Sequence, residues 1–126
     1  MTIEYTRDYL CGEPGPNLYF RGNSQEFFDL VCLLKALAFQ RLIIKREAIV
    51  NGKKSFISFL SQKEAKILNA YVEETNEVVI NLDFEYWKEL LLRLFLIYLK
   101  PGRIYVDMDE EFGLKADANF IIDSNL

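Results

Sequence analysis

The residues whose type and spacing best suit chemistry form an acidic run close to the end of the chain. In an extended strand, Asp107 and Asp109 would point to the same side, where two carboxylates can bind a hard cation. An EF-hand loop beginning at Asp107 is excluded. Its sixth position, which requires glycine, is Phe112, and its twelfth, which requires glutamate, is Ala118. The run is therefore predicted to be a solvated acidic turn without a metal.

The chain lacks the residues on which most enzyme mechanisms depend. It contains no histidine, which excludes Ser-His-Asp and Cys-His catalysis and removes the commonest general base. Cys11 and Cys32 are too few for a zinc site without other ligands; they are predicted to be free thiols, with a disulfide as the alternative. The segment CGEPGPN has two glycines but no lysine and leads into a predicted strand, so it is not a phosphate-binding loop. We predict no catalytic residue and no cofactor.

Charge is distributed unevenly along the chain. Residues 1–72 hold ten basic and seven acidic side chains, whereas residues 73–126 hold five basic and twelve acidic ones. The basic residues concentrate between Arg41 and Lys66. Either the two regions are solvated faces that attract each other in the fold, or the acidic region is a docking surface for a partner. Nucleic-acid binding is not expected, because the sequence pI is near 4.9.

Length and composition favour a single α+β domain over residues 1–126. Of these residues, 51% are hydrophobic, which is enough for a core without disulfides or a structural metal. The first ten residues, MTIEYTRDYL, do not have the basic and apolar segments of a secretory signal. The apolar stretch 90–99 is interrupted by Arg93 and is too short to cross a bilayer. We expect a cytoplasmic protein that does not bind membranes.

Two segments have the apolar spacing of amphipathic helices. Residues 24–39 follow Asn23, which can cap the first turn, and Glu26 stands three positions later, as in a capping box. Residues 84–99 follow Asp83, another favourable N-cap, and end at a Pro-Gly pair.

Strands are predicted around these helices, in pairs joined by turns. The strongest hairpin signal is Asn51-Gly52, because both residues tolerate a positive φ. The predicted pairs are residues 3–10 with 17–20, 42–50 with 53–60, 66–73 with 77–82, and 103–109 with 119–123. The third pair has an alternative, since Ser61 and Glu64 would form a capping box for a short helix over residues 62–72.

The two helical segments lie 60 residues apart, and the sequences around them align without a gap. Asn23 matches Asp83, and Phe27 matches Trp87. This alignment predicts two tandem hairpin–helix–hairpin repeats, residues 1–60 and 61–126; the alternative is a chance likeness between two strand-to-helix units. The predicted fold is an α+β domain in which a mixed or antiparallel sheet carries the two main helices on one face.

The sheet face without helices has two possible roles. The alternation of Ile43, Lys45 and Glu47 predicts a polar face in contact with water. Alternatively, tyrosines on this face contact a partner; those considered are Tyr5, Tyr9, Tyr19 and Tyr105.

These observations predict a non-enzymatic protein-binding module. A small acidic protein without catalytic residues has the profile of a bacterial immunity protein that neutralises a basic toxin, commonly a nuclease. The predicted partner-binding residues form two acidic clusters, Asp107, Asp109, Glu110, Glu111 and Asp117 in one and Glu73, Glu74 and Glu77 in the other. The alternatives are a self-associating structural or regulatory domain, which would form a homodimer, and a histidine-independent small-molecule-binding protein.

Overall fold

The computed structural model describes residues 1–8, 12, 15–23, 25–62, 69–99, 102–106 and 119–123. It contains two helices, α1 (Phe27–Phe39) and α2 (Phe84–Leu99). Its strands are β1 (Thr2–Thr6), β2 (Asn17–Arg21), β3 (Leu42–Val50), β4 (Lys53–Ser61), β5 (Asn69–Val72), β6 (Glu77–Leu82), β7 (Arg103–Val106) and β8 (Asn119–Asp123).

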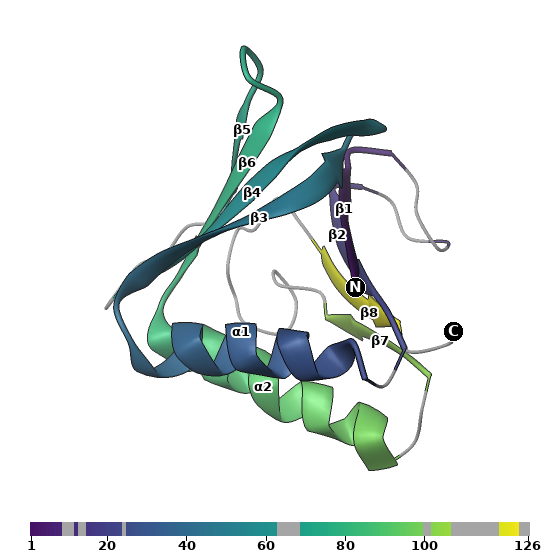
Figure 1. Cartoon of the computed structure of the whole chain (residues 1–126), viewed down its shortest axis with the longest axis vertical. Helices are drawn as coiled ribbons and strands as arrows, with labels where there is room; N and C mark the ends of the chain where they lie inside the picture. Colours follow the sequence, from purple (N-terminus) through teal and green to yellow (C-terminus); the bar gives the residue numbers. More distant parts are fainter. Residues whose placement is uncertain are drawn as a thin grey trace.

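All of these strands belong to one mixed sheet, in the order β5-β6-β4-β3-β1-β2-β8-β7. The sheet curls into a half-barrel, and α1 and α2 lie side by side against it, running in opposite directions (Figure 1). We call the face that packs on the helices the inner face and the opposite one the outer face. The predicted α+β class, with two main helices on one face of a mixed sheet, is confirmed.

The two halves of the chain repeat the same order of elements and nearly the same pairings. In each half the hairpins are antiparallel, β1 with β2 and β3 with β4 in the first, β5 with β6 and β7 with β8 in the second. Two parallel pairings, β4 with β6 and β2 with β8, join the halves. They are equivalent, because β6 has the place in the second half that β2 has in the first, and β8 has the place that β4 has in the first. β1 also pairs with β3, whereas β5 and β7 are the two ends of the sheet. That the halves arose by duplication stays a prediction.

The core lies between the inner face and the helices, where both halves contribute aromatic residues. The indole of Trp87 packs edge-on against the rings of Phe59 and Phe120, with centroids 6.1 and 6.3 Å apart. Phe20 stacks on Phe120 at 6.2 Å. Trp87 is fully buried, and its Nε1 donates a hydrogen bond of 3.0 Å to the carbonyl oxygen of Leu60. These aromatic contacts join β2, β4, β8 and α2 at one point.

The predicted caps form at both helices. The Asn23 and Glu26 side chains each accept a hydrogen bond from the other residue's backbone N–H, at 2.9 and 3.1 Å, which is the predicted capping box. α1 begins at Phe27, three residues later than predicted, because residues around the box form a turn first. Asp83 accepts a hydrogen bond of 2.9 Å from the Glu85 N–H, and α2 covers the predicted range.

The predicted strand pairs are also present, but the strand predicted over residues 3–10 is too long. β1 ends at Thr6, Arg7 and Asp8 form a bend, and residues 9 and 10 lie outside the described part of the chain. Asn51 and Gly52 adopt φ values of 50° and 82° in the turn between β3 and β4. The alternative of a helix over residues 62–72 is wrong for its last four residues, which form β5 and pair with β6; residues 63–68 lie outside the described part of the chain. β7 ends at Val106, and the rest of the predicted strand over 103–109 is likewise not described.

The outer face fits the polar prediction over β3, because Ile43, Lys45 and Glu47 are all exposed there. The tyrosine alternative is wrong for the two tyrosines whose side chains are described. Tyr5 is buried in the core and stacks on Tyr71, with ring centroids 6.4 Å apart, and Tyr19 is buried too. Tyr9 and the side chain of Tyr105 lie outside the described residues.

Candidate interaction surfaces

The second predicted acidic cluster occupies the turn between β5 and β6. Glu73 and Glu74 are exposed, whereas Glu77 is half-buried and pairs with Lys45 at 3.3 Å. Asn76, at a φ of 53° in this turn, donates a hydrogen bond of 2.9 Å from Nδ2 to the Val50 carbonyl oxygen. The acidic turn therefore lies beside the β3–β4 turn, and the Lys45–Glu77 pair is one direct contact between the basic and acidic regions.

The first predicted cluster, Asp107, Asp109, Glu110, Glu111 and Asp117, lies outside the described residues. Of the eight predicted partner-binding residues, the structure thus places three. Glu73 and Glu74 lie in the β5–β6 turn, and Glu77 is the first residue of β6. Only Glu73 and Glu74 among the three have strongly exposed side chains, because Glu77 is engaged by Lys45.

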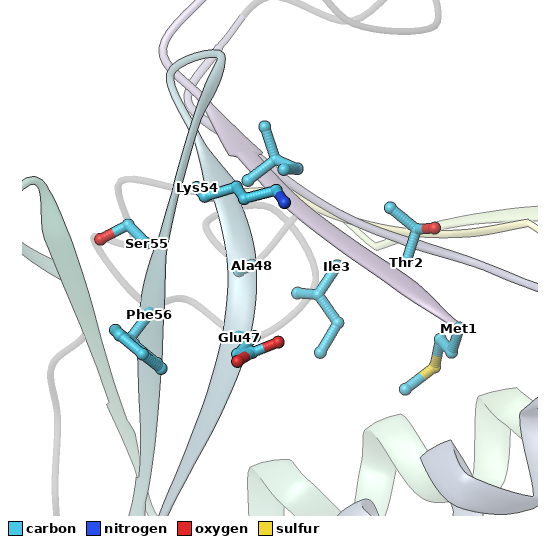
Figure 2. A pocket seen from close by; sticks show the side chains of 9 residues that line it. Met1, Thr2, Ile3, Glu47, Ala48, Lys54, Ser55 and Phe56 are labelled. Atoms are coloured by element: carbon cyan, nitrogen blue, oxygen red, sulfur yellow. The ribbon is translucent and has the colours of Figure 1, made fainter.

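A second surface is the opening between β1 and β3, which the sequence analysis did not predict. β3 has nine residues, but only two of them, Ile49 and Val50, pair with β1. Before that point the two strands diverge and border a cavity of about 420 Å³. Figure 2 shows Ile3 and Glu47 facing each other across the opening, with Lys54 extending over its narrow end. The lining combines residues of the inner face, such as Ile3 and Ala48, with residues of the outer face.

A third surface is the side of the helices that faces away from the sheet. It carries large apolar side chains with high fractional exposure: Phe28 at 65%, Phe39 at 63%, Leu92 at 59% and Phe95 at 46%. Phe28 and Phe39 are eleven residues apart, about three helical turns, so they lie on one stripe of α1. The Nζ of Lys88 lies 5.4 Å from the centre of the Phe39 ring, which links α2 to this stripe. We call these four residues and their surroundings the helix surface.

The outer face over β2 and β8 contains a buried polar cluster. Asp123, with only 2% of its surface exposed, accepts hydrogen bonds from the Tyr19 hydroxyl at 2.7 Å and from Arg103 Nη2 at 2.8 Å. Because donors surround the carboxylate, its charge is compensated inside the protein. The cluster joins β2, β7 and β8 through the side chains of Tyr19, Arg103 and Asp123.

Other features of the described residues give no indication of chemistry. Cys32 is a free thiol exposed on α1, and Cys11 is not described. Within the described ranges, no group of three or more cysteine, aspartate or glutamate side chains is arranged to hold a metal ion. No helix in that part of the chain is both long and apolar enough to cross a membrane.

Comparison with known proteins gives no match. No family model, no curated protein and no solved structure matches this chain. The three surfaces must therefore be interpreted from their own geometry and charge.

The sequence did not indicate the opening, because the strand predicted over residues 3–10 is nearly as long as the one over residues 42–50. In the structure β1 covers only Thr2–Thr6 and pairs with the last two residues of β3. The earlier main-chain groups of β3 therefore have no described strand partner on that side. The helix surface had a weak signal, because the apolar residues of α1 occupy more of its circumference than one buried stripe requires.

Proposed function

We propose that the chain is a non-enzymatic protein-binding module. The observation that carries this proposal is the helix surface, where four large apolar side chains are exposed by 46–65%. Single exposed apolar residues are ordinary, but several on one pair of packed helices are typical of surfaces that another protein covers. Aromatic residues also supply much of the binding energy at protein interfaces, and three of the four residues are phenylalanines.

A more specific proposal concerns the partner's charge. The excess of acidic residues beyond position 72 and the exposed Glu73 and Glu74 support a basic partner, such as a toxin that an immunity protein neutralises. Complementary charge would raise the association rate and select the partner. The acidic turn and the helix surface lie at opposite ends of the molecule (Figure 1), so one interface of ordinary size would not include both.

The experiment uses two double variants of the full chain, each the control for the other. Proteins captured by the wild-type chain from its host are identified, and the binding of each purified candidate is measured with Phe28→Ser/Phe39→Ser and with Glu73→Lys/Glu74→Lys. If the partner covers the helix surface, the first variant weakens binding at least tenfold, because two exposed aromatic contacts are lost. If the acidic turn directs a basic partner, the second variant mainly lowers the association rate.

The outcomes separate the two proposals. Loss of binding in the serine variant alone supports the protein-binding module and contradicts the acidic docking site. A lower association rate in the lysine variant alone, with a basic partner, supports the toxin-inhibitor proposal and contradicts the helix surface. If every captured protein binds both variants as tightly as the wild type, neither surface has the proposed role.

Self-association is a second candidate, which the same helix surface favours. Two copies could cover their exposed phenylalanines in a symmetric dimer. Light scattering over a wide concentration range tests this directly. A dimer that Phe28→Ser/Phe39→Ser converts into a monomer would support self-association, and a wild-type chain that is monomeric at all concentrations would contradict it.

A further inference from the structure

The opening between β1 and β3 exposes one edge of β3, and the main-chain groups on this edge can be identified from the hydrogen bonds of the neighbouring residues. The N–H of Asn51, next to the end of β3, donates a hydrogen bond of 2.8 Å to the Tyr5 carbonyl oxygen in β1. The directions of the main-chain N–H and C=O groups alternate along a strand. In β3 these groups therefore point toward β1 at odd-numbered residues and toward β4 at even-numbered ones. Ile43, Lys45 and Glu47 therefore direct their N–H and C=O groups into the opening. On that side of β3, no described strand pairs with these three residues.

The length of this edge suits a short extended peptide. Five residues from Ile43 to Glu47 span about 17 Å at the rise of a β-strand. The cavity at the narrow end gives an added strand room for side chains on both faces of the sheet. On the inner side these side chains would meet Ile3 and Ala48, and on the outer side Glu47 and the Lys54 ammonium. Alternate apolar and charged side chains fit these surroundings.

The charge around the edge favours an acidic occupant. The segment Arg41–Lys54 carries five basic residues and one acidic residue, a net charge of +4. All six side chains are exposed: Arg41, Lys45, Arg46, Glu47, Lys53 and Lys54. Among the described residues, the ion pair between Lys45 and Glu77 neutralises one of them. An exposed sheet edge with this charge would repel basic segments and attract acidic ones.

We propose that the open edge of β3 binds an acidic, extended segment of another polypeptide, which adds to the sheet as a further strand beside Ile43–Glu47. Main-chain hydrogen bonds to the odd-numbered residues would provide affinity, and the basic residues around the edge would provide selectivity. This site goes beyond the proposed function, because it includes neither the helix surface nor the acidic turn and has its own class of ligand.

The test uses the full chain and a capped nine-residue peptide of alternating glutamate and valine as the probe. Amide chemical shifts of the ¹⁵N-labelled protein are recorded during titration. We expect the amides of Ile43, Lys45 and Glu47 to shift, and the affinity to fall as salt is added. Two control peptides are matched to the probe. One has lysine in place of glutamate, and the other keeps the glutamates but has proline in place of two valines, so it loses main-chain donors. Neither is expected to bind at this edge.

A pair of variants at one position tests the main-chain contact. Glu47→Pro removes an N–H that points into the opening and leaves the β3–β4 pairing in place, whereas Glu47→Ala removes the same charge and keeps the N–H. We expect the probe to bind Glu47→Pro about tenfold more weakly than Glu47→Ala. Circular dichroism establishes that both variants are folded.

Three results would overturn the proposal. The first is an acidic probe that shifts no amide between Ile43 and Glu47 at millimolar concentration. The second is equal binding of the proline-containing acidic peptide, which would show attraction by charge alone. The third is equal affinity for the two Glu47 variants. If Glu47→Pro does not fold, the amide shifts of the wild-type chain and the two control peptides still decide the question.

Discussion

The outer face of the sheet is buried over β2 and β8 but open over β4 and β6, although these two strand pairs occupy equivalent positions in the two halves. Tyr19, Ile121 and Asp123 are buried, with 7%, 0% and 2% of their surfaces exposed. In the register of the β4–β6 pairing, the equivalent residues are Val79, Ser58 and Leu60, in the same order. All three are only half-buried. On the inner face, by contrast, both pairs are fully packed. The two halves therefore resemble each other in the burial of their core residues but not in the burial of their outer-face residues.

One pair of positions shows this difference most clearly. Arg103 stands opposite Asp123 in the β7–β8 ladder, and Ile43 stands opposite Leu60 at the equivalent place in the β3–β4 ladder. The second half has an ion pair with a buried carboxylate where the first half has an apolar pair with Ile43 70% exposed. The outer face is thus covered over β2 and β8 and more exposed over β4 and β6, on the side of the sheet that includes β3.

The largest expected effect concerns the equivalent helix residues Phe27 and Trp87. Both are buried, so replacing either with alanine leaves a cavity, at a typical cost of about 3–5 kcal/mol of unfolding free energy. Trp87→Ala is expected at the upper end, because Trp87 contacts Phe59 and Phe120 and donates a hydrogen bond. Urea unfolding followed by circular dichroism measures both. A larger loss for Phe27→Ala would contradict the central role of Trp87.

Asp123→Asn should lower the unfolding free energy by about 2 kcal/mol, because Arg103 and the Tyr19 hydroxyl lose a buried, charged acceptor. The equivalent change in the first half, Leu60→Ala, should cost about 1 kcal/mol, because this side chain is only half-buried. Urea midpoints of the two variants make the comparison. Equal losses would show that burial of the outer face over β8 adds little stability.

The Lys45–Glu77 pair should contribute far less than the Asp123 cluster. Its side chains are 52% and 34% exposed, so water and salt screen their attraction. A double-mutant cycle with Lys45→Ala and Glu77→Ala is expected to give a coupling energy of about 0.3 kcal/mol, decreasing with added salt. A coupling above about 1 kcal/mol would mean that this ion pair helps to fix the β5–β6 hairpin beside β3.

The smallest effect is a dependence of stability on pH that Glu26 causes at the start of the first helix. Hydrogen bonds from the Met1 ammonium and then from the Asn23 N–H hold the pKa of Glu26 below its ordinary value of 4.5. A lowered carboxyl pKa stabilises the fold above the ordinary value, and this stabilisation disappears as the pH falls through the pKa of the folded state.

We therefore expect Glu26→Gln to melt at a slightly lower temperature than the wild type at neutral pH, with the gap closing below about pH 4. The equivalent residue in the second half is Tyr86, and Tyr86→Phe serves as a control without such pH dependence. A gap of constant size across this range would contradict the ionic role of Glu26.

Local patterns in the sequence were sufficient to predict the helices and hairpins. The caps at Asn23 and Asp83 and the Asn51-Gly52 turn act within a few residues, and each forms as predicted. The order of the strands could not be predicted in this way, because pairs such as β2 and β8 lie about a hundred residues apart in the sequence. Core periodicity alone does not specify which buried edges pair.

The surfaces were harder to predict for the same reason. The sequence predicts Glu77 as a docking residue, because its partner Lys45 lies 32 positions away. The two residues meet only through the β3–β4 and β4–β6 pairings. The opening beside β3 likewise depends on where β1 ends in space. The charge of a segment can be predicted from sequence, but its neutralisation by another segment is a property of the fold.

The position of Trp87 also gives the molecule a built-in optical reporter. It is the only tryptophan in the chain, and its indole is fully buried between Phe59 of the first half and Phe120 of the second. Its fluorescence should therefore be blue-shifted in the folded state and move to longer wavelength when either half separates from the other. A single emission spectrum would thus report whether the two halves are assembled, without any label.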